Sequence, residues 1–199
     1  MSTPEPMSPL DRCLGVGRFG AERPDSRLQI AQRRLAIARV MARAGNTDTV
    51  GAAVEKDTGL KLPSPGHTST SGDVTAIWIA PDTWLVMQAM PTSTDLLARL
   101  TRACGADASV VDQSCGYVAL QLSGARACDV LAKGCRIDLH PRAFGPGRAA
   151  ATTIAHVHGI VWQVDQTPTF ELIVPSTLAE HVYEWLCISA AEFGYEVRV

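Results

Sequence analysis

Two stretches of the chain carry the same order of hydrophobic and polar positions. Residues 75–105 predict a strand, a Pro-Asp turn, a second strand, and a helix that ends at Gly105. Residues 159–186 predict a strand, a polar turn, a strand and a helix in the same order. A short strand follows each helix, at residues 108–113 and 195–199. The repeat predicts two ββαβ units and therefore an α+β fold built by duplication.

The helices of the two units have candidate start signals. The first helix is expected to begin at Ser93 or Thr94. In the second unit Thr177 and Glu180 have the spacing of a capping box. The side chains that would pack this second helix on a sheet are Leu178, Val182, Trp185, Leu186, Ser189 and Phe193.

A strand and a short helix are predicted between the two units. Residues 116–124 alternate between apolar and polar side chains, which is typical of a strand. In the helix that follows, Ala127, Val130 and Leu131 form the expected buried stripe. Gly134 stands where a residue in the left-handed conformation commonly ends a helix.

The first third of the chain is less regular. Residues 28–40 alternate in a way that favours strands, although their composition also suits a helix. Residues 47–59 predict a short helix, capped by Thr47 or Thr49 and ended at Gly59.

The domain organisation follows from these elements. Residues 62–73 are rich in Pro, Ser and Gly, which predicts a polar loop. We therefore expect an N-terminal region at 1–73, made of a tail, short elements and this loop. The duplicated α+β domain would occupy residues 74–199, and the whole chain would form one compact domain.

Charge and cysteine content narrow the class of protein. The 199 residues carry a formal net charge of −2, which gives no general attraction to nucleic acid or membranes. The N-terminal sequence has prolines and acids instead of an apolar run, and no stretch approaches the length of a membrane span. The six cysteines are irregularly spaced, without the pairs of a zinc site. We expect a reduced, cytoplasmic protein.

The segment from Arg27 to Arg43 is strongly basic. If Leu35 and Ile37 point into a core, Arg34 and its neighbours form an outward row. Such a row would meet an acidic surface of a partner or of this chain, or would remain solvated. No aromatic side chains are interleaved for base stacking, so nucleic acid is not the expected partner. The arginines are Arg27, Arg33, Arg34, Arg39 and Arg43, with no acid between them.

Three residue types suited to nucleophilic catalysis lie close together in the sequence. They are Cys135, Asp138 and His140. However, Cys135 directly follows the end of a predicted helix, where the partial negative charge disfavours a thiolate. Lys133 could compensate, but we expect it to be solvated. We interpret the segment as a turn, with Cys135 as a small apolar side chain packed beneath it.

Other candidate sites have simpler interpretations. His156 and His158 would face the same side of a strand, but no further metal ligand of suitable spacing accompanies them. Residues 15–20, GVGRFG, resemble half of a dinucleotide-binding motif without its preceding strand and following helix. Asp112 and Ser114 are expected to form hydrogen bonds in a turn. Core packing is the expected role of Trp78, Trp84, Trp162 and Trp185.

A set of motifs resembles a known family. The motifs are WxAPDxWLV at 78–86, VDQSxG at 111–116, LSGARACDVLAKGCxIDLHPRAFGPG at 122–147, and FELIVP at 170–175. Together they resemble the gamma subunit of heterotetrameric sarcosine oxidases. The Trp-Leu and Val-Asp-x-Ser-x-Gly motifs are also similar to the folate-binding aminomethyltransferase (T-protein) fold, which agrees with the duplicated units.

The resemblance implies membership in an enzyme complex. Complexes of this kind oxidise sarcosine to glycine and produce hydrogen peroxide, with the one-carbon unit leaving as formaldehyde or methylenetetrahydrofolate. The implied partners are the alpha, beta and delta subunits. FAD, FMN, NAD and tetrahydrofolate would belong to the alpha and beta subunits, and zinc to the delta subunit. The gamma chain itself is implied to be an accessory, structural subunit without a cofactor.

Proteins with two other functions share this fold. A stand-alone folate-binding one-carbon protein of this fold would need acids on the strand where this chain has Ile160, Val161 and Trp162. An iron–sulfur assembly factor of the same fold shares Lys-Gly-Cys, but here the motif continues as Arg136-Ile137-Asp138-Leu139. We therefore assign no catalytic, cofactor-binding or metal-binding residue in this chain.

Overall fold

The structure, a computed structural model, describes residues 8–22, 28–90 and 95–198. Its contacts group into two compact units, each with its own sheet. Unit 1 consists of the N-terminal segment through Arg33, Cys115–Pro146, and the C-terminal segment from Ala151. Unit 2 consists of Arg34–Ser114 and Gly147–Ala150. None of the described helices is long and apolar enough to cross a membrane.

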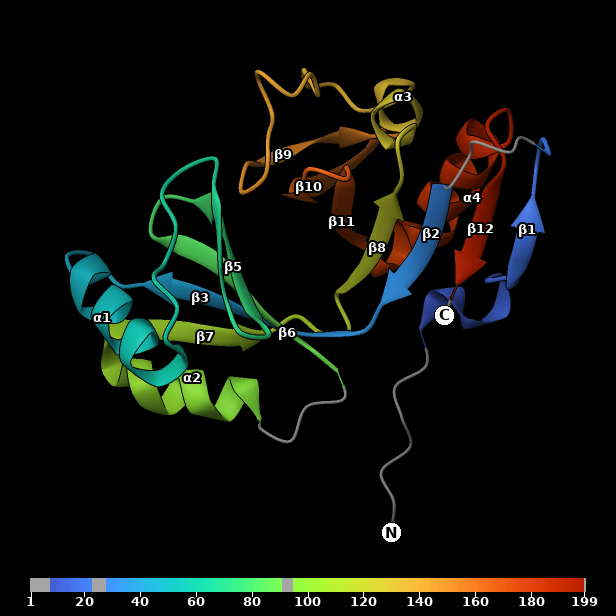
Figure 1. Cartoon of the computed structure of the whole chain (residues 1–199). Helices are drawn as coiled ribbons and strands as arrows, with labels where there is room; N and C mark the ends of the chain where they lie inside the picture. Colours follow the sequence, from blue (N-terminus) through green and yellow to red (C-terminus); the bar gives the residue numbers. More distant parts are fainter. Residues whose placement is uncertain (1–7, 23–27, 91–94, 199) are drawn as a thin grey trace, which may run out of the picture. The chain divides into compact units, whose positions relative to one another are not determined.

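Unit 2 has a five-stranded antiparallel sheet in the order β4-β5-β6-β3-β7. Figure 1 shows its two α-helices on the same face of this sheet. The strands are β3 (Leu35–Ala42), β4 (Thr68–Ser71), β5 (Val74–Ala80), β6 (Thr83–Ala89) and β7 (Ala108–Asp112). The helices are α1 (Thr47–Thr58), α2 (Leu96–Cys104) and the 3₁₀ turn η2 (Gly105–Asp107).

The core of unit 2 lies between this sheet and its helices. Alternate residues of β3 point to the helical side, and Ala38 and Val40 are buried there. The helices contribute Val50, Val54, Leu96, Leu100 and Cys104 to the same cluster. The other residues of β3, among them Ile37 and Arg39, therefore face away from the helices.

Unit 1 has a seven-stranded sheet in the order β1-β12-β2-β8-β11-β10-β9. The pairs β1–β12, β10–β11, β8–β11 and β2–β8 are antiparallel, whereas β12 and β2 are parallel. The strands are β1 (Gly17–Phe19), β2 (Leu28–Arg33), β8 (Tyr117–Ser123), β9 (Ala149–Ile154), β10 (Val157–Asp165), β11 (Thr169–Pro175) and β12 (Tyr195–Arg198). Figure 1 shows this sheet with its helices.

The helices of unit 1 pack on the sheet and on one another. α4 contacts β8 and β11, and α3 and η1 contact α4. The helical elements of unit 1 are η1 (Pro9–Arg12), α3 (Ala127–Ala132), η3 (Ser176–Leu178) and α4 (Ala179–Ala190). The predicted stripe of α3 is confirmed, because Ala127, Val130 and Leu131 are fully buried.

The duplicated ββαβ plan is confirmed. In unit 2 the chain runs β5-β6-α2-β7, and in unit 1 it runs β10-β11-α4-β12. In both units the last strand runs parallel to the strand before the helix. One strand, β3, lies between them in unit 2, whereas β8 and β2 lie between them in unit 1. The copies therefore differ in how many strands the helical connection crosses.

The contacts divide the chain differently from the boundary at residue 73 that the sequence predicts. β2 and β3 do form strands, as the alternation in residues 28–40 favoured. However, both are interior strands, one in each sheet, so residues 1–73 are not a separate region. The division falls after Arg33 and after Ser114 because consecutive strands join different sheets at these points.

Some predicted helix ends differ from the structure. Gly59 does end α1, with a left-handed φ of 69°. The N-cap of α1 is Asn46 instead of a threonine, and the Thr47 hydroxyl donates to Asp82 Oδ1 at 2.6 Å. Ser93 and Thr94 lie outside the described residues, and the N-cap of α2 is Asp95, which accepts from the Ala98 N–H at 3.0 Å.

The start of α4 also differs from the prediction. No capping box forms from Thr177 and Glu180, because η3 leads into the helix and no side chain caps it. Leu178 is 44% exposed, so the buried stripe begins further along the chain. The buried members of the predicted stripe are Val182, Leu186, Ser189 and Phe193.

Candidate functional site

Asp138 and His140 form a turn and do not pair with each other through their side chains. Asp138 Oδ1 accepts a hydrogen bond from the backbone N–H of His140 at 2.9 Å. His140 Nδ1 in turn accepts from the Arg142 N–H at 3.2 Å. The carboxylate is therefore bonded to the main chain instead of orienting the imidazole, as nucleophilic catalysis would need. The interpretation of this segment as a turn is confirmed.

Cys135 is a packed side chain at the base of this turn. It is 7% exposed, and it forms an isolated β-bridge with Ile154. Burial raises the pKa of the Cys135 thiol to about 11, although a hydrogen bond from the Ile137 backbone acts in the opposite direction. A thiol of this kind is protonated at neutral pH and is a poor nucleophile.

We expect Cys135 to resist alkylation in the folded chain. With iodoacetamide at pH 8, the exposed Cys115 should be labelled at least about tenfold faster than the buried Cys135. Mass spectrometry of peptides from a time course measures both rates. Unfolding in urea should remove the difference, which is the control. Equal rates in the folded chain would contradict the burial of Cys135.

Gly134 is required for close packing and not for a left-handed turn. It is absent from the glycines with positive φ, so the predicted left-handed conformation is wrong. A Cβ atom at this position would lie 2.6 Å from Cζ2 of Trp185. The indole ring of α4 therefore lies directly on the backbone that follows α3.

Lys133 is not simply solvated, as the sequence suggested. Its ammonium donates to the backbone carbonyl of Ser189 and forms an ion pair with Glu192. It also lies 5.0 Å from the centroid of the Phe193 ring. A cation at the carbonyl end of a helix interacts favourably with the helix dipole. Lys133 and Gly134 thus attach the end of α3 to α4, which gives two residues of the Lys-Gly-Cys motif a structural role.

The two candidate histidines do not lie on one strand. His156 has a φ of 68° and, with Ala155 at 49°, forms the tight turn between β9 and β10. His158 lies on β10, and both imidazoles are exposed. The expectation that they share a strand face is therefore wrong. No group of three or more potential metal ligands occurs within the described ranges.

The glycine-containing segment at 15–20 holds an edge strand. β1 lies inside it, and among the described strands it pairs only with β12. η1 precedes it. The strand–loop–helix order of a dinucleotide-binding motif is thus not formed there.

Asp112 and Ser114 make the turn hydrogen bonds that the sequence predicts. Asp112 Oδ1 accepts from the Ser114 N–H at 2.8 Å. Ser114 Oγ accepts from the Ile37 N–H at 3.0 Å. Together they fix the end of β7 against β3.

The tryptophans serve packing to different degrees. Trp84 and Trp162 are buried, and Trp84 Nε1 donates to the carbonyl of Pro63 at 2.9 Å. Trp78 and Trp185 are partly exposed. Trp78 pairs with Trp84 across β5 and β6. Trp185 covers Gly134, as described above.

A buried carboxylate, Glu171, was not identified among the candidate residues from the sequence. It lies in the middle of β11 and is 9% exposed. Its Oε1 accepts from Gln121 Nε2 at 3.2 Å and lies 4.0 Å from Arg33 Nη1. Burial raises the pKa of Glu171 above its usual value, although Arg33 and Gln121 partly offset it. The signal was present in FELIVP, where one acid interrupts an apolar strand.

We expect Glu171→Gln to stabilise the chain at neutral pH. Because the folded-state pKa is raised, the folded state disfavours the charged form, and this penalty exists only where the carboxyl is ionised. The gain should therefore be largest above the folded-state pKa and vanish as the pH falls below the usual pKa of glutamate. Urea unfolding from pH 4 to pH 8 measures it. A gain that is independent of pH would contradict this account.

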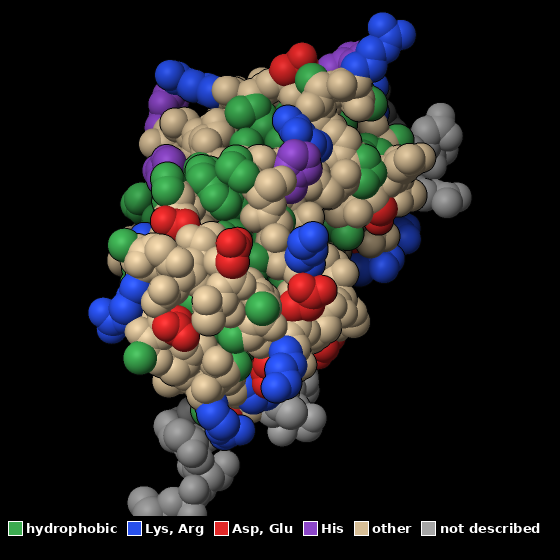
Figure 2. Space-filling model, turned by 90° about the vertical axis from the view of Figure 1, so that its left-hand side faces the viewer, with side chains coloured by type: hydrophobic (Ala, Val, Ile, Leu, Met, Phe, Trp, Pro, Cys, Tyr) green, Lys and Arg blue, Asp and Glu red, His purple; other side chains and the backbone are tan. Residues whose placement is uncertain are grey.

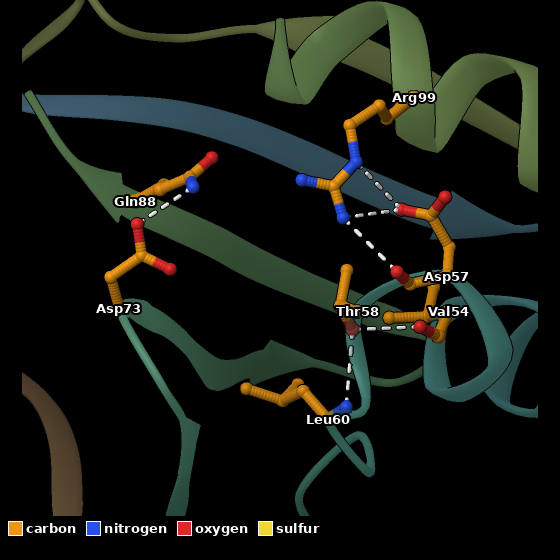
Figure 3. Close-up of polar contacts among 7 residues, drawn as sticks. All are labelled: Val54, Asp57, Thr58, Leu60, Asp73, Gln88 and Arg99. Atoms are coloured by element: carbon orange, nitrogen blue, oxygen red, sulfur yellow. Dashed lines mark hydrogen bonds and ion pairs between the residues drawn. The ribbon is translucent and has the colours of Figure 1, made fainter. Parts of the chain in front are cut away.

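Unit 2 contains its own group of polar contacts, drawn in Figure 3. Gln88 is buried on β6, and its Nε2 donates to Asp73 Oδ2 at 2.8 Å. Arg99 of α2 binds both the carboxylate of Asp57, at 3.0 Å, and its backbone carbonyl. This ion pair joins the two helices of the unit. These contacts stabilise the fold and bring no catalytic pair together.

The arginines of the basic segment do not form one row. Arg27 lies outside the described residues. Arg33 lies in unit 1 beside Glu171, whereas Arg43 in unit 2 donates from Nε to the Ala106 carbonyl at 2.8 Å. Arg39 shares its side of β3 with Ile37, so it does not belong to an outward row opposite Leu35 and Ile37. On the face shown in Figure 2, basic and acidic side chains are interspersed.

The fold and these contacts define a class of protein. The chain is a duplicated α+β protein in which the reactive side chains identified from the sequence are held in turns, packing contacts and helix attachments. The profile of the sarcosine oxidase, gamma subunit family matches residues 43–192. The chain belongs to this family.

Curated relatives agree with this assignment. A sarcosine oxidase subunit gamma from Corynebacterium sp. (strain P-1) is 34% identical over 148 residues, which are 73% of this chain and 71% of that protein. The subunit gamma from Arthrobacter sp. is 35% identical over 147 residues, covering 72% and 70% respectively.

Solved structures extend the similarity to the fold of nearly the whole chain. A chain of the heterotetrameric sarcosine oxidase from Corynebacterium sp. U-96, in complex with pyrrole 2-carboxylate, aligns with a TM-score of 0.81 and 26% identity. The alignment covers 94% of this chain and 96% of that one. Aminomethyltransferase T of the glycine cleavage system from Bartonella henselae aligns with a TM-score of 0.65 and 16% identity, over 94% and 57%. This second similarity concerns the fold alone and agrees with the predicted T-protein-like architecture.

Proposed function

We propose that this chain is the accessory gamma subunit of a sarcosine oxidase complex, bound to alpha, beta and delta subunits. The observation that carries the proposal is the alignment of 94% of the chain with a subunit of a heterotetrameric sarcosine oxidase. The complex would oxidise sarcosine to glycine and reduce oxygen to hydrogen peroxide. The one-carbon unit would leave as formaldehyde or methylenetetrahydrofolate.

In this proposal the cofactors reside on the partner subunits. FAD, FMN, NAD and tetrahydrofolate would be held by the alpha and beta subunits and zinc by the delta subunit, with the assembly located in the cytoplasm. The role of this chain would be structural. The way Lys133 and Gly134 attach α3 to α4 supports this role, because a family motif is used there for internal packing.

A stand-alone folate-binding protein is the weaker candidate. Ile160, Val161 and Trp162 lie on β10 and are buried, so this stretch offers no carboxylate to a bound one-carbon group. An iron–sulfur assembly factor is also weaker, because burial keeps Cys135 protonated and inaccessible.

Co-expression tests the proposed function. The tagged chain is expressed with the alpha, beta and delta subunits from the same source, and the assembly is isolated by size-exclusion chromatography. We expect the four chains to co-elute and to produce peroxide when sarcosine is added. Separate elution of this chain from a sarcosine-oxidising assembly would contradict the proposal.

The Cys135→Ala variant distinguishes the remaining alternative. The accessory role predicts unchanged peroxide production per assembled complex, with only the modest loss of stability expected for a small buried side chain, about 1 kcal/mol. An iron–sulfur assembly factor that depends on this thiol would lose its function in cells. Micromolar binding of tetrahydrofolate by the isolated chain would instead favour the one-carbon protein.

A further inference from the structure

Three large apolar side chains of unit 1 are exposed along α4 and β1. Ile188 on α4 is 76% exposed, Val16 before β1 is 65% exposed, and Phe19 on β1 is 44% exposed. Ile188 and Val16 are the two most exposed large apolar residues in the described part of the chain. Single exposed apolar residues are common on protein surfaces, whereas a group of them marks an interaction site. Their meaning therefore depends on whether they lie together.

Contacts within unit 1 bring the end of β1 to the end of α4. The Ala21 N–H donates to the Ala191 carbonyl at 2.8 Å. A Cβ atom on Gly20 would lie 2.9 Å from Cα of Ala191, so the two backbones touch. Phe19 directly precedes this contact, and Ile188 lies one helical turn before Ala191. The exposed side chains of β1 and α4 therefore flank one contact and form one apolar surface.

Two acids extend this surface along α4. Glu180, Glu184 and Ile188 are spaced four residues apart, so they form one row on the helix. Both carboxylates are exposed, and neither forms an ion pair with another residue that the structure describes. Burial raises the pKa of the Cys13 thiol, and Glu180 and Glu184 raise it further. The segment that leads to Val16 therefore starts beside these acids.

The charge of this row decides which occupant fits the surface. Membrane surfaces and nucleic acids are negatively charged, so Glu180 and Glu184 repel them. A symmetric contact with a second copy of the chain would bring the same acidic row into both halves of the interface. Like charges four residues apart also destabilise the helix that carries them. A protein segment with apolar side chains and a neighbouring lysine or arginine covers the apolar surface and relieves this repulsion.

We propose that Val16, Phe19 and Ile188, with Glu180 and Glu184 beside them, form a docking surface for a partner subunit. The partner presents a segment with apolar side chains next to a lysine or arginine. Its apolar side chains bury the exposed surface, and its cation fixes the position of the segment along α4. The inference rests on the proposed function, because it assigns the surface through which the accessory subunit meets its partner.

Substitution of Ile188 tests the apolar part of the surface in the complete complex. The tagged chain is co-expressed with the partner subunits, and their dissociation from the resin is followed at about 0.05 M and about 0.5 M NaCl. Ile188→Ser should make dissociation at least about tenfold faster at both salt concentrations, because apolar contacts are not screened. Since Ile188 is exposed in the isolated chain, the unfolding temperature should stay within about 2 °C of the wild type.

A second variant tests the acidic part. Replacing Glu180 and Glu184 together by glutamine should speed dissociation at about 0.05 M NaCl and leave it unchanged at about 0.5 M, where the wild-type attraction is already screened. The unfolding temperature should be maintained, because the lost interaction of Glu180 with the helix dipole is offset by the removal of the repulsion. Lost binding can then not be attributed to unfolding.

The control and the outcomes separate this inference from the proposed function. Val164→Ser removes an exposed apolar side chain from β10 and should leave dissociation unchanged. If the wild-type chain assembles and the variants at Ile188 and at the two glutamates dissociate as it does, the docking surface is wrong while the accessory role stands. If the isolated chain is a dimer by light scattering that Ile188→Ser separates, with dissociation from the complex unchanged, the occupant is a second copy and the inference is wrong. If the wild-type chain does not assemble at all, both proposals fall.

Discussion

Replacing Phe170 by alanine is expected to lower the free energy of unfolding by about 4 kcal/mol. Phe170 is fully buried on β11, where it lies between Leu122 of β8 and Gln163 of β10. The loss combines the transfer of an aromatic ring to water with the cavity that remains in a close-packed sheet. Urea unfolding followed by circular dichroism measures the change.

A matched control for Phe170 lies on the adjacent strand. Val164 on β10 is 45% exposed, so Val164→Ala should cost less than about 0.5 kcal/mol. A loss at Phe170 as small as that at Val164 would show that β11 is not at the centre of the core of unit 1.

Gly134→Ala is expected to lower the free energy of unfolding by about 2 kcal/mol, although alanine usually favours helix formation more than glycine does. The new methyl group would overlap the indole of Trp185, with Cζ2 at 2.6 Å and Cε2 at 2.9 Å. Because the ring is rigid, it must move as a whole, and its packing at the junction of α3 and α4 is lost. Thermal and urea unfolding measure the effect.

Two further variants identify the cause of this loss. Gly51→Ala in the middle of α1 places its methyl group in open space and should stabilise the chain by about 0.5–1 kcal/mol. Gly134→Ala combined with Trp185→Leu should cost less than the sum of the two single changes, because the smaller side chain relieves the overlap. Strict additivity would show that contact with the indole is not the reason for glycine at residue 134.

The local elements could be predicted from the sequence because their periodicity reflects one buried face each. The two ββαβ units and the stripe of α3 are examples. The assembly of the sheets could not be predicted in the same way. β2 and β3 are adjacent in sequence and similar in pattern, yet they join different sheets. That choice depends on pairing with distant strands, such as β12 with β2, which no local pattern encodes.

The roles of the candidate site residues could also be predicted only in part from the sequence. The interpretation of Cys135 as a buried side chain was reached from its place after a helix. The reason for Gly134 was misassigned, because a glycine after a helix suits both a left-handed turn and a close contact. Only the position of Trp185 decides between them. Arg39 was grouped with Arg34 in one outward row, although the alternation along the strand already places Arg39 on the same side as Ile37.

The interior position of β12 has a consequence for synthesis of the chain on the ribosome. All five strands of unit 2 have been made once Asp112 has emerged, so its sheet can form early. In unit 1, β1 and one edge of β2 have no strand to pair with until β12 has been synthesised, and β12 follows the other strands of this sheet in the sequence. Translation must therefore reach Arg198 before these edges are paired, and open edges promote aggregation. A nascent chain that stalls before Tyr195 should therefore depend on chaperones, with its N-terminal strands the exposed part.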